Sequence, residues 1–166
     1  MRRAAPLALA MILSACATTT GRIENGVFYS SKGYQVRLPN AGWRVEHSGQ
    51  ADLELKREVP PGGMLANATC DGREVGRPAD VLSRHLTFGL THRETLESAR
   101  TEAGGRQAVR TVVRGTTAGA EVTVEAVVIK DGRCVYDFLY VAPVAAFEVG
   151  RGDFEAFVES FGGAAR

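Results

Sequence analysis

The fold is decided by residues 107–141, which read QAVRTVVRGTTAGAEVTVEAVVIKDGRCVYDFLYV. Three segments of this stretch are rich in the β-branched and aromatic residues that favour strands: 107–115, 120–130 and 133–141. Thr117-Ala118-Gly119 separates the first two segments, and Asp131-Gly132 separates the last two. Asp-Gly between two strand-like segments is a strong signal for a type I′ hairpin turn. The stretch therefore predicts an antiparallel meander of three strands.

The last of these segments, 133–141, is apolar on both of its faces. Tyr136 and Phe138 alternate with Val135 and Leu139, and only Asp137 interrupts this apolar pattern. A strand with two apolar faces is normally central in its sheet and covered on both sides. We therefore expect helices against both faces of the sheet.

One helix is predicted before the meander. Pro78 suits its first helical position, and Asp80 suits the positive end of the helix dipole. Leu82, Leu86 and Leu90 recur every four residues, which places them on one side of a helix.

A second helix is predicted at the end of the chain. Asp153 is its expected N-cap, and Gly162 is its expected residue just past the end. A single apolar stripe should pack on the sheet: Phe154, Phe157, Val158 and Phe161. Residues 143–149 are expected to form a short extra helical turn.

Alternation with a period of two also predicts strands in the first half, at 34–38, 43–46, 52–56 and 64–70. Residues 94–101 fit either a strand or a helix. Several strands, a helix, a meander and a final helix indicate an α+β fold, an antiparallel β-sheet flanked by helices. We expect a single domain over residues 27–163.

The N-terminus has the features of a secretory signal. Arg2 and Arg3 precede an apolar run at 4–15, which is too short for the roughly 20 residues that cross a bilayer. Leu13-Ser14-Ala15-Cys16 resembles the bacterial lipobox, in which the cysteine receives a diacylglycerol and becomes the mature N-terminus. The resemblance implies a signal peptide over residues 1–15 and lipidation of Cys16. The alternative is an ordinary signal peptide with a chance cysteine.

Residues 16–26 are predicted to be a lipidated N-terminus and a flexible tether, because they lack apolar periodicity. The lipobox implies several acyl chains, which hold a protein stably at a membrane. Ala17 after the cysteine is similar to the enteric pattern that sorts lipoproteins to the outer membrane. We therefore expect the bacterial cell envelope, with the lipid anchor in the outer membrane and the domain facing the periplasm.

The mature part of the chain resembles the Mog1/PsbP-like family over residues 27–161. The resemblance is carried by Phe28-Tyr29-Ser30, by 33–39 followed by Gly42-Trp43, by Val135–Phe138 and by the final Phe154–Phe161 segment. It implies an α/β/α sandwich around an antiparallel sheet. Members of this family mostly act in binding or assembly and share no catalytic motif, so no functional residue is transferred from them.

Cys70 and Cys134 are the cysteines that remain beside Cys16. The space outside the inner membrane is oxidising, and the two residues lie at the end and the start of predicted strands, so a disulfide between them is expected. The alternative is two buried thiols that behave as small apolar residues. The C-x-x-C spacing of redox enzymes is absent from the sequence.

The titratable candidates suggest no catalytic or metal site. His47, His85 and His92 have no cysteine or carboxylate at zinc-ligand spacing. Asp137 is interpreted as a structural residue that faces a polar gap or pairs with an arginine such as Arg110 or Arg114, and the alternative is a general base with a raised pKa.

Arg106, Arg110 and Arg114 recur every four residues. They are interpreted as a solvated face of the sheet, and the alternative is a patch that binds anions or lipid headgroups.

The charge balance argues against nucleic acid as a partner. The chain has 20 basic and 19 acidic residues, and phosphate binding requires a basic surplus. No nucleotide-binding or hydrolase motif is present, so we expect no cofactor and no enzymatic activity. The favoured function is non-catalytic binding of an unknown envelope protein, or assembly. The alternatives are a small-molecule or lipid pocket between sheet and helix and, third, an enzyme with an unrecognised site.

Overall fold

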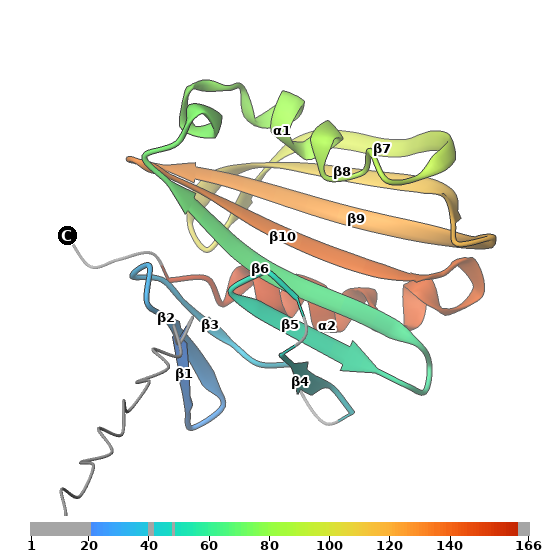
Figure 1. The fold of residues 1–166 in the computed structure, drawn as a ribbon, viewed down its shortest axis with the longest axis horizontal. Helices are drawn as coiled ribbons and strands as arrows, with labels where there is room; N and C mark the ends of the chain where they lie inside the picture. Colours follow the sequence, from blue (N-terminus) through green and yellow to red (C-terminus); the bar gives the residue numbers. More distant parts are fainter. Residues whose placement is uncertain (1–20, 40–41, 48, 163–166) are drawn as a thin grey trace, which may run out of the picture.

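The computed structural model describes residues 21–39, 42–47 and 49–162 and has the predicted α+β architecture. Its main element is a twisted antiparallel sheet with strand order β4-β5-β6-β10-β9-β8-β7 (Figure 1). The strands are β4 (Arg44–Glu46), β5 (Leu53–Arg57), β6 (Gly62–Cys70), β7 (Thr91–Ala103), β8 (Arg106–Thr117), β9 (Ala120–Asp131) and β10 (Cys134–Pro143). The predicted meander is thus confirmed as β8, β9 and β10, and β10 is central.

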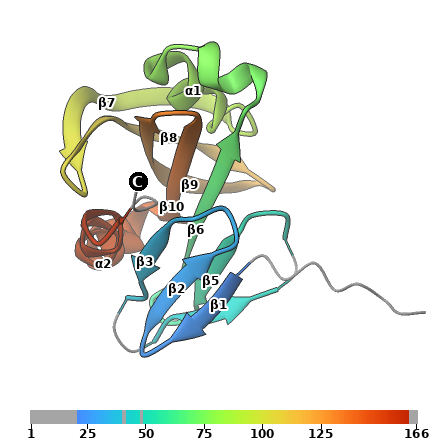
Figure 2. The ribbon, with the colours of Figure 1, turned by 90° about the vertical axis from the view of Figure 1, so that its left-hand side faces the viewer.

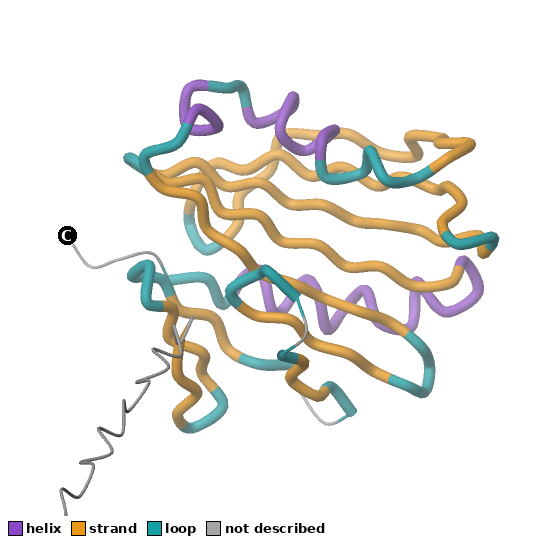
Figure 3. The backbone as a smooth tube through the Cα atoms, viewed as in Figure 1, coloured by secondary structure: helices purple, strands orange, loops and turns teal. Residues whose placement is uncertain are grey.

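A smaller sheet and two helices complete the fold. The small sheet contains β1 (Gly21–Glu24), β2 (Val27–Ser30) and β3 (Gln35–Arg37). The helices are α1 (Ala79–His85) and α2 (Phe147–Glu159), which follow the 3₁₀ turns Arg73–Gly76 and Val144–Ala146. Figure 3 shows the helical segments on two sides of the strands.

The two faces of the large sheet are named here after the helices that cover them. Tyr136, Phe138 and Tyr140 point to the α2 face, where they belong to the main core with Phe154 and Phe157. The rings of Phe138 and Phe157 meet edge to face with centroids 5.7 Å apart. The α1 face has a much smaller core: Leu82, Val128 and Val135. Strand alternation thus separates a large aromatic core from a small aliphatic one.

The small sheet closes the main core on the α2 face, beside the C-terminal end of α2 (Figure 2). Tyr34 and Val36 are buried in that core. Gly162 pairs with Gln35 through two backbone hydrogen bonds of 2.8 and 2.9 Å. The glycine predicted to end the last helix therefore connects the end of the chain to β3, while α2 itself ends at Glu159.

Both helix starts differ from the sequence prediction. Helix α1 begins at Ala79, with Pro78 as its N-cap, and it ends before Leu90. Helix α2 begins at Phe147, so the expected N-cap Asp153 lies inside the helix. Asp153 accepts hydrogen bonds from Arg57 at 2.9 Å and Trp43 at 3.0 Å, and these tertiary contacts explain its position better than a cap does.

Residues 91–103 form strand β7. This strand includes residues 94–101, for which the sequence fits either a strand or a helix. Twelve of its thirteen residues are exposed or only partly buried, because β7 is the last strand of the sheet and pairs only with β8. Edge strands of this length carry charged side chains that discourage unwanted pairing. Arg93, Glu94, Glu97 and Arg100 do so here.

The hairpin turn between β9 and β10 differs in type from the prediction. The two-residue turn between β9 and β10 is Gly132-Arg133, because Asp131 pairs with Cys134. Only Gly132 has a positive φ, of 60°, as expected for a type II′ turn rather than the predicted type I′.

The C-terminal part of the predicted tether is a hairpin. Asn25 and Gly26, with φ of 49° and 73°, join β1 to β2 in the pattern of a type I′ turn. Arg22 lies over the ring of Tyr29 at 4.8 Å. The ordered domain therefore begins at residue 21 at the latest, and Cys16 and the rest of the predicted signal lie outside the described residues.

Candidate functional site

A buried carboxylate lies on the α2 face where the aromatic core gives way to charged residues. Glu125 on β9 faces Val112 on β8, and its side chain is 1% exposed. Arg110 Nε lies 2.7 Å from Glu125 Oε1, and Arg151 Nε on α2 lies 3.2 Å from Oε2. Arg110 also pairs with Glu155 at 3.0 Å and Arg151 with Glu97 at 3.2 Å. These five residues are called the Glu125 cluster below.

Arg110 and Arg151 donate hydrogen bonds to Glu155 and Glu97, whereas their contacts with Glu125 are ion pairs. Although the separations are short, Arg110 Nε, Arg151 Nε and Glu125 Oε2 have no partner with hydrogen-bond geometry. Burial raises the pKa of Glu125, and the positive charges of Arg110 and Arg151 oppose that rise. Burial alone would lower the pKa of Arg110, but its contacts with Glu125 and Glu155 reverse the effect and raise it. The two guanidiniums offset the charge of Glu125, but burial prevails and its pKa is raised overall.

Two hollows run along α2, with the Glu125 cluster between them; together they are called the α2 groove. One has a volume of about 60 Å³ and is lined by four glutamates and one arginine: Glu102, Glu125, Glu155, Glu159 and Arg110. The other has a volume of about 260 Å³, and its lining includes Leu96, Val144, Phe147, Glu97, Glu148, Arg114 and Arg151. Six glutamates against three arginines give the groove an excess of negative charge.

The structure separates Asp137 from the arginines expected to pair with it. Asp137 lies on the α1 face of β10, between Asn67 and Val128 on the neighbouring strands. Arg110 and Arg114 lie on the α2 face, so the predicted ion pair is wrong because strand alternation places the groups on opposite faces. The Oδ1 atom of Asp137 is buried without a hydrogen-bond partner, and burial raises its pKa to about 6.

The three arginines expected to act together have different environments. Arg106 pairs with Asp131 at 2.7 Å and lies over the ring of Phe161 at 5.1 Å. Arg110 belongs to the Glu125 cluster, and Arg114 is exposed in the α2 groove. The solvated-face interpretation therefore holds for Arg114 alone.

The three histidines are dispersed. His47 follows β4, His92 belongs to β7, and His85 ends α1 with its ring 4.7 Å from that of Phe88. Within the described ranges, no group of three or more histidine, cysteine, aspartate or glutamate side chains could hold a metal ion.

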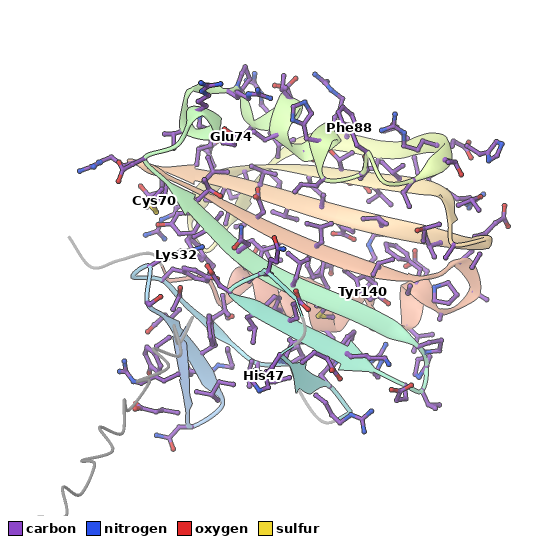
Figure 4. All side chains as sticks on the ribbon, in the orientation of Figure 1. Lys32, His47, Cys70, Glu74, Phe88 and Tyr140 are labelled. Atoms are coloured by element: carbon purple, nitrogen blue, oxygen red, sulfur yellow. A yellow bond between two sulfur atoms is a disulfide. The ribbon has the colours of Figure 1, made fainter. Side chains whose placement is uncertain are left out.

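Cys70 and Cys134 face each other at the ends of β6 and β10, whose pairing brings their Cα atoms to 4.1 Å. Their sulfurs form a disulfide in the structure, with an S–S distance of 2.02 Å. Figure 4 shows Cys70 at the tip of β6, far along the sheet from Tyr140.

Sequence reasoning missed Asp52, which joins the two sheets. Asp52 accepts hydrogen bonds from Tyr34 Oη at 3.1 Å and from the Ala68 backbone N–H at 2.9 Å, and it pairs with Lys32 at 2.7 Å. Burial, followed by the charge of Asp52, raises the pKa of Tyr34. Asp52 also lines a hollow of about 560 Å³ beside the β1–β2 hairpin, but its carboxylate is fully engaged there. Asp before a strand gives no sequence signal for such a role.

No protein-family model matches the chain, and no curated protein matches it by sequence. Solved structures do match. A Bacteroides thetaiotaomicron protein gives a TM-score of 0.63 at 11% identity over 87% of this chain, which spans 50% of that protein. The cyanobacterial PsbP (CyanoP) of Synechocystis sp. PCC 6803 gives 0.57 at 10% identity, covering 92% of this chain and 98% of its own.

Two further structures carry functional names. LpqN of Mycobacterium tuberculosis, described as involved in cell envelope biogenesis, has a TM-score of 0.59 at 14% identity and covers 82% of this chain and 87% of its own. The Ran-binding protein Mog1p of Saccharomyces cerevisiae has a TM-score of 0.53 at 10% identity, with coverages of 78% and 89%. At these identities the similarity establishes the fold, which is Mog1/PsbP-like as the sequence predicts.

Proposed function

We propose that this chain is a lipid-anchored, non-catalytic binding or assembly protein of a bacterial cell envelope. The anchor is Cys16 in the lipobox-like Leu13-Ser14-Ala15-Cys16. Within the described ranges, neither helix has the length and apolar character needed to cross a bilayer. One protein of the same fold is described as an envelope-biogenesis protein and another as Ran-binding.

The observation that carries the binding role is the charge distribution of the α2 groove. Its buried glutamate is paired with two arginines, while Glu102 and Glu159 are exposed and line the smaller hollow together with the buried Phe154 and Val158. Such a surface fits a partner segment that carries basic side chains, because charge complementarity steers association and sets specificity. We assign the partner to this groove.

The alternative of an apolar pocket between sheet and helix is not favoured. The space between β10 and α2 is filled by aromatic rings, with Tyr140 stacked 5.2 Å from Phe147 and 5.8 Å from Phe154. Interiors packed in this way leave little room for a ligand.

Anchoring is tested by feeding alkyne-palmitate to bacteria that express the full chain or Cys16→Ser. We expect the full chain to take up label and to sediment with the membranes, and the variant to remain unlabelled. Cys134→Ser is the matched control and keeps its label. An unlabelled, water-soluble wild-type protein would overturn the anchor.

Binding is tested with a photo-crosslinking amino acid at position 159 in the α2 groove and, as a control, at exposed position 73 in the 3₁₀ turn that precedes α1. We expect a discrete adduct in living cells from position 159 only, and its loss when Glu102→Lys reverses the charge at one position of the groove. Equal adducts from both positions, or an adduct that survives the reversal, would show that the groove is not the binding surface.

A further inference from the structure

A second hollow lies on the α1 face, at the opposite side of the same strands. Its volume is about 470 Å³, and it lies between the segment that follows α1 and strands β7 and β8. Its lining includes Arg84, Phe88, Arg93, Thr95, Ser98 and Thr111. We call it the α1 hollow. Figures 1 and 2 both place α1 and β7 at the end of the domain opposite β1.

The charge of the α1 hollow is of one sign. Two guanidiniums line it, and no carboxylate does. Arg93 lies over the ring of Phe88 at 5.1 Å, and no ion pair to Arg93 is found among the described residues. Arg84 pairs with Asp80 at 3.3 Å, but both side chains are more than half exposed, so that pair is weak. Both arginines can therefore bind another anion.

The floor of the hollow supplies hydroxyl groups. Ser98 on β7 pairs directly with Thr111 on β8, so both project to the α1 face. Ser83 on α1 donates to Thr111 Oγ1 at 2.7 Å, which leaves the hydroxyl hydrogen of Thr111 free to point elsewhere. Thr111 is only 2% exposed. Hydroxyls and guanidiniums together are the groups that bind carboxylates and phosphates.

An aromatic ring stands at the rim. Phe88 is 60% exposed, and Figure 4 shows it on the outside of the α1 segment. Its ring lies 4.7 Å from the ring of His85 and 5.1 Å from the guanidinium of Arg93. An exposed ring fixed by its neighbours offers a flat surface to an apolar or planar group.

We infer that the α1 hollow binds an organic anion whose carboxylate or phosphate group lies between Arg84 and Arg93 while its planar or apolar part packs on Phe88. The site is distinct from the α2 groove, and it does not depend on lipid anchoring. The proposed envelope protein would therefore also bind an organic anion, either as a free small molecule or as a group on a larger one.

The test is isothermal titration calorimetry of the purified full chain with phenyl phosphate and with benzoate. We expect saturable one-to-one binding of at least one of them, and the compound that binds identifies the anionic group. Arg93→Gln and Arg84→Gln should each weaken it by about tenfold, as expected for a lost charged hydrogen bond. Both arginines are exposed, so the variants keep their fold.

Arg114→Gln is the matched control, since it removes the same charge from the other face of β8. We expect its affinity to stay within about twofold of wild type. Phe88→Ala should weaken phenyl phosphate but leave inorganic phosphate unchanged. The inference is overturned if neither compound binds saturably, if Arg93→Gln binds like wild type, or if Arg114→Gln loses as much affinity as Arg93→Gln.

Discussion

The two faces of the sheet share strands β7, β8 and β9, but their charged side chains are paired to different extents. On the α2 face, Glu125 is enclosed between Arg110 and Arg151, so these charges satisfy one another. On the α1 face, Arg84 and Arg93 border a hollow without a carboxylate. Helix length explains the difference, because α2 has 13 residues and α1 only 7. Glu155 and Arg151 on the longer helix pair with Arg110 and Glu125 of the sheet, whereas the described residues offer no ion-pair partner to Arg93 on the α1 face.

The largest expected effect tests whether the α2 face dominates stability. Phe154→Ala should lower the free energy of unfolding by about 3–5 kcal/mol, because Phe154 is 0% exposed in the aromatic core. Leu82→Ala on the α1 face should lower it by about 2 kcal/mol, at the low end for leucine, because its core is small. Urea denaturation measures both, and equal losses would contradict the comparison.

The disulfide should stabilise both faces alike, because it joins the central strands β6 and β10. Cys70 and Cys134 are 64 residues apart, and closing such a loop stabilises a fold by about 4 kcal/mol in the chain-entropy model. We expect Cys70→Ala/Cys134→Ala to lose roughly that amount in urea denaturation and to become insensitive to reductant. The gap between Phe154→Ala and Leu82→Ala should persist in this background. If reductant left the stability of the wild-type protein unchanged, the disulfide would be absent or would not contribute to stability.

Removing the charge of Glu125 tests how much the buried ion pairs of the α2 face contribute to stability, compared with a hydroxyl contact on the α1 face. Glu125→Gln keeps the shape of the side chain but leaves Arg110 and Arg151 facing a neutral group, so stability should fall by about 2–3 kcal/mol. Thr111→Val on the α1 face removes one hydroxyl contact and should cost about 1 kcal/mol. Calorimetric unfolding separates the two. If Glu125→Gln unfolded at the wild-type temperature, the cluster would not stabilise the α2 face.

The strands could be predicted because their signals are local. β-Branched and aromatic residues between turn signals identified β8, β9 and β10, and the two apolar faces of 133–141 placed β10 in the centre of the sheet. The β1–β2 hairpin also had a local signal, Asn25-Gly26. The prediction missed it because residues 16–26 were interpreted as a tether from their lack of apolar periodicity.

The charged network could not be predicted, since it depends on which face each side chain occupies. An ion pair of Asp137 with Arg110 or Arg114 was one of the expected arrangements, but the sheet keeps these arginines on the face opposite Asp137. The start of α2 was missed for a similar reason. Gly150 and Gly152 lower helix propensity, yet Gly150 lies directly against the Tyr140 side chain, so tertiary packing outweighs the local preference. Asp153, expected as a cap, instead binds Arg57 from within that helix.

A pH-dependent effect is expected for Asp137, the buried carboxyl on the α1 face that has no arginine partner. Burial raises its pKa from 3.8 to about 6. The folded protein therefore binds a proton more tightly than the unfolded chain, and stability should fall as pH rises from about 4 to about 6. Asp137→Asn cannot ionise, so its stability relative to that of wild type should rise by about 2–3 kcal/mol as the pH increases from 4 to 7.

Urea denaturation of both proteins across this pH range measures the gain. Asn67→Ala, on the neighbouring position of β6, perturbs the same site without removing a titrating group and should follow the wild-type pH dependence. If Asp137→Asn instead paralleled wild type at every pH, Asp137 would have a charged partner or full hydration in solution. The α1 face would then satisfy its buried charge as the α2 face does, and the contrast between the two faces would be confined to the arginines at the hollow.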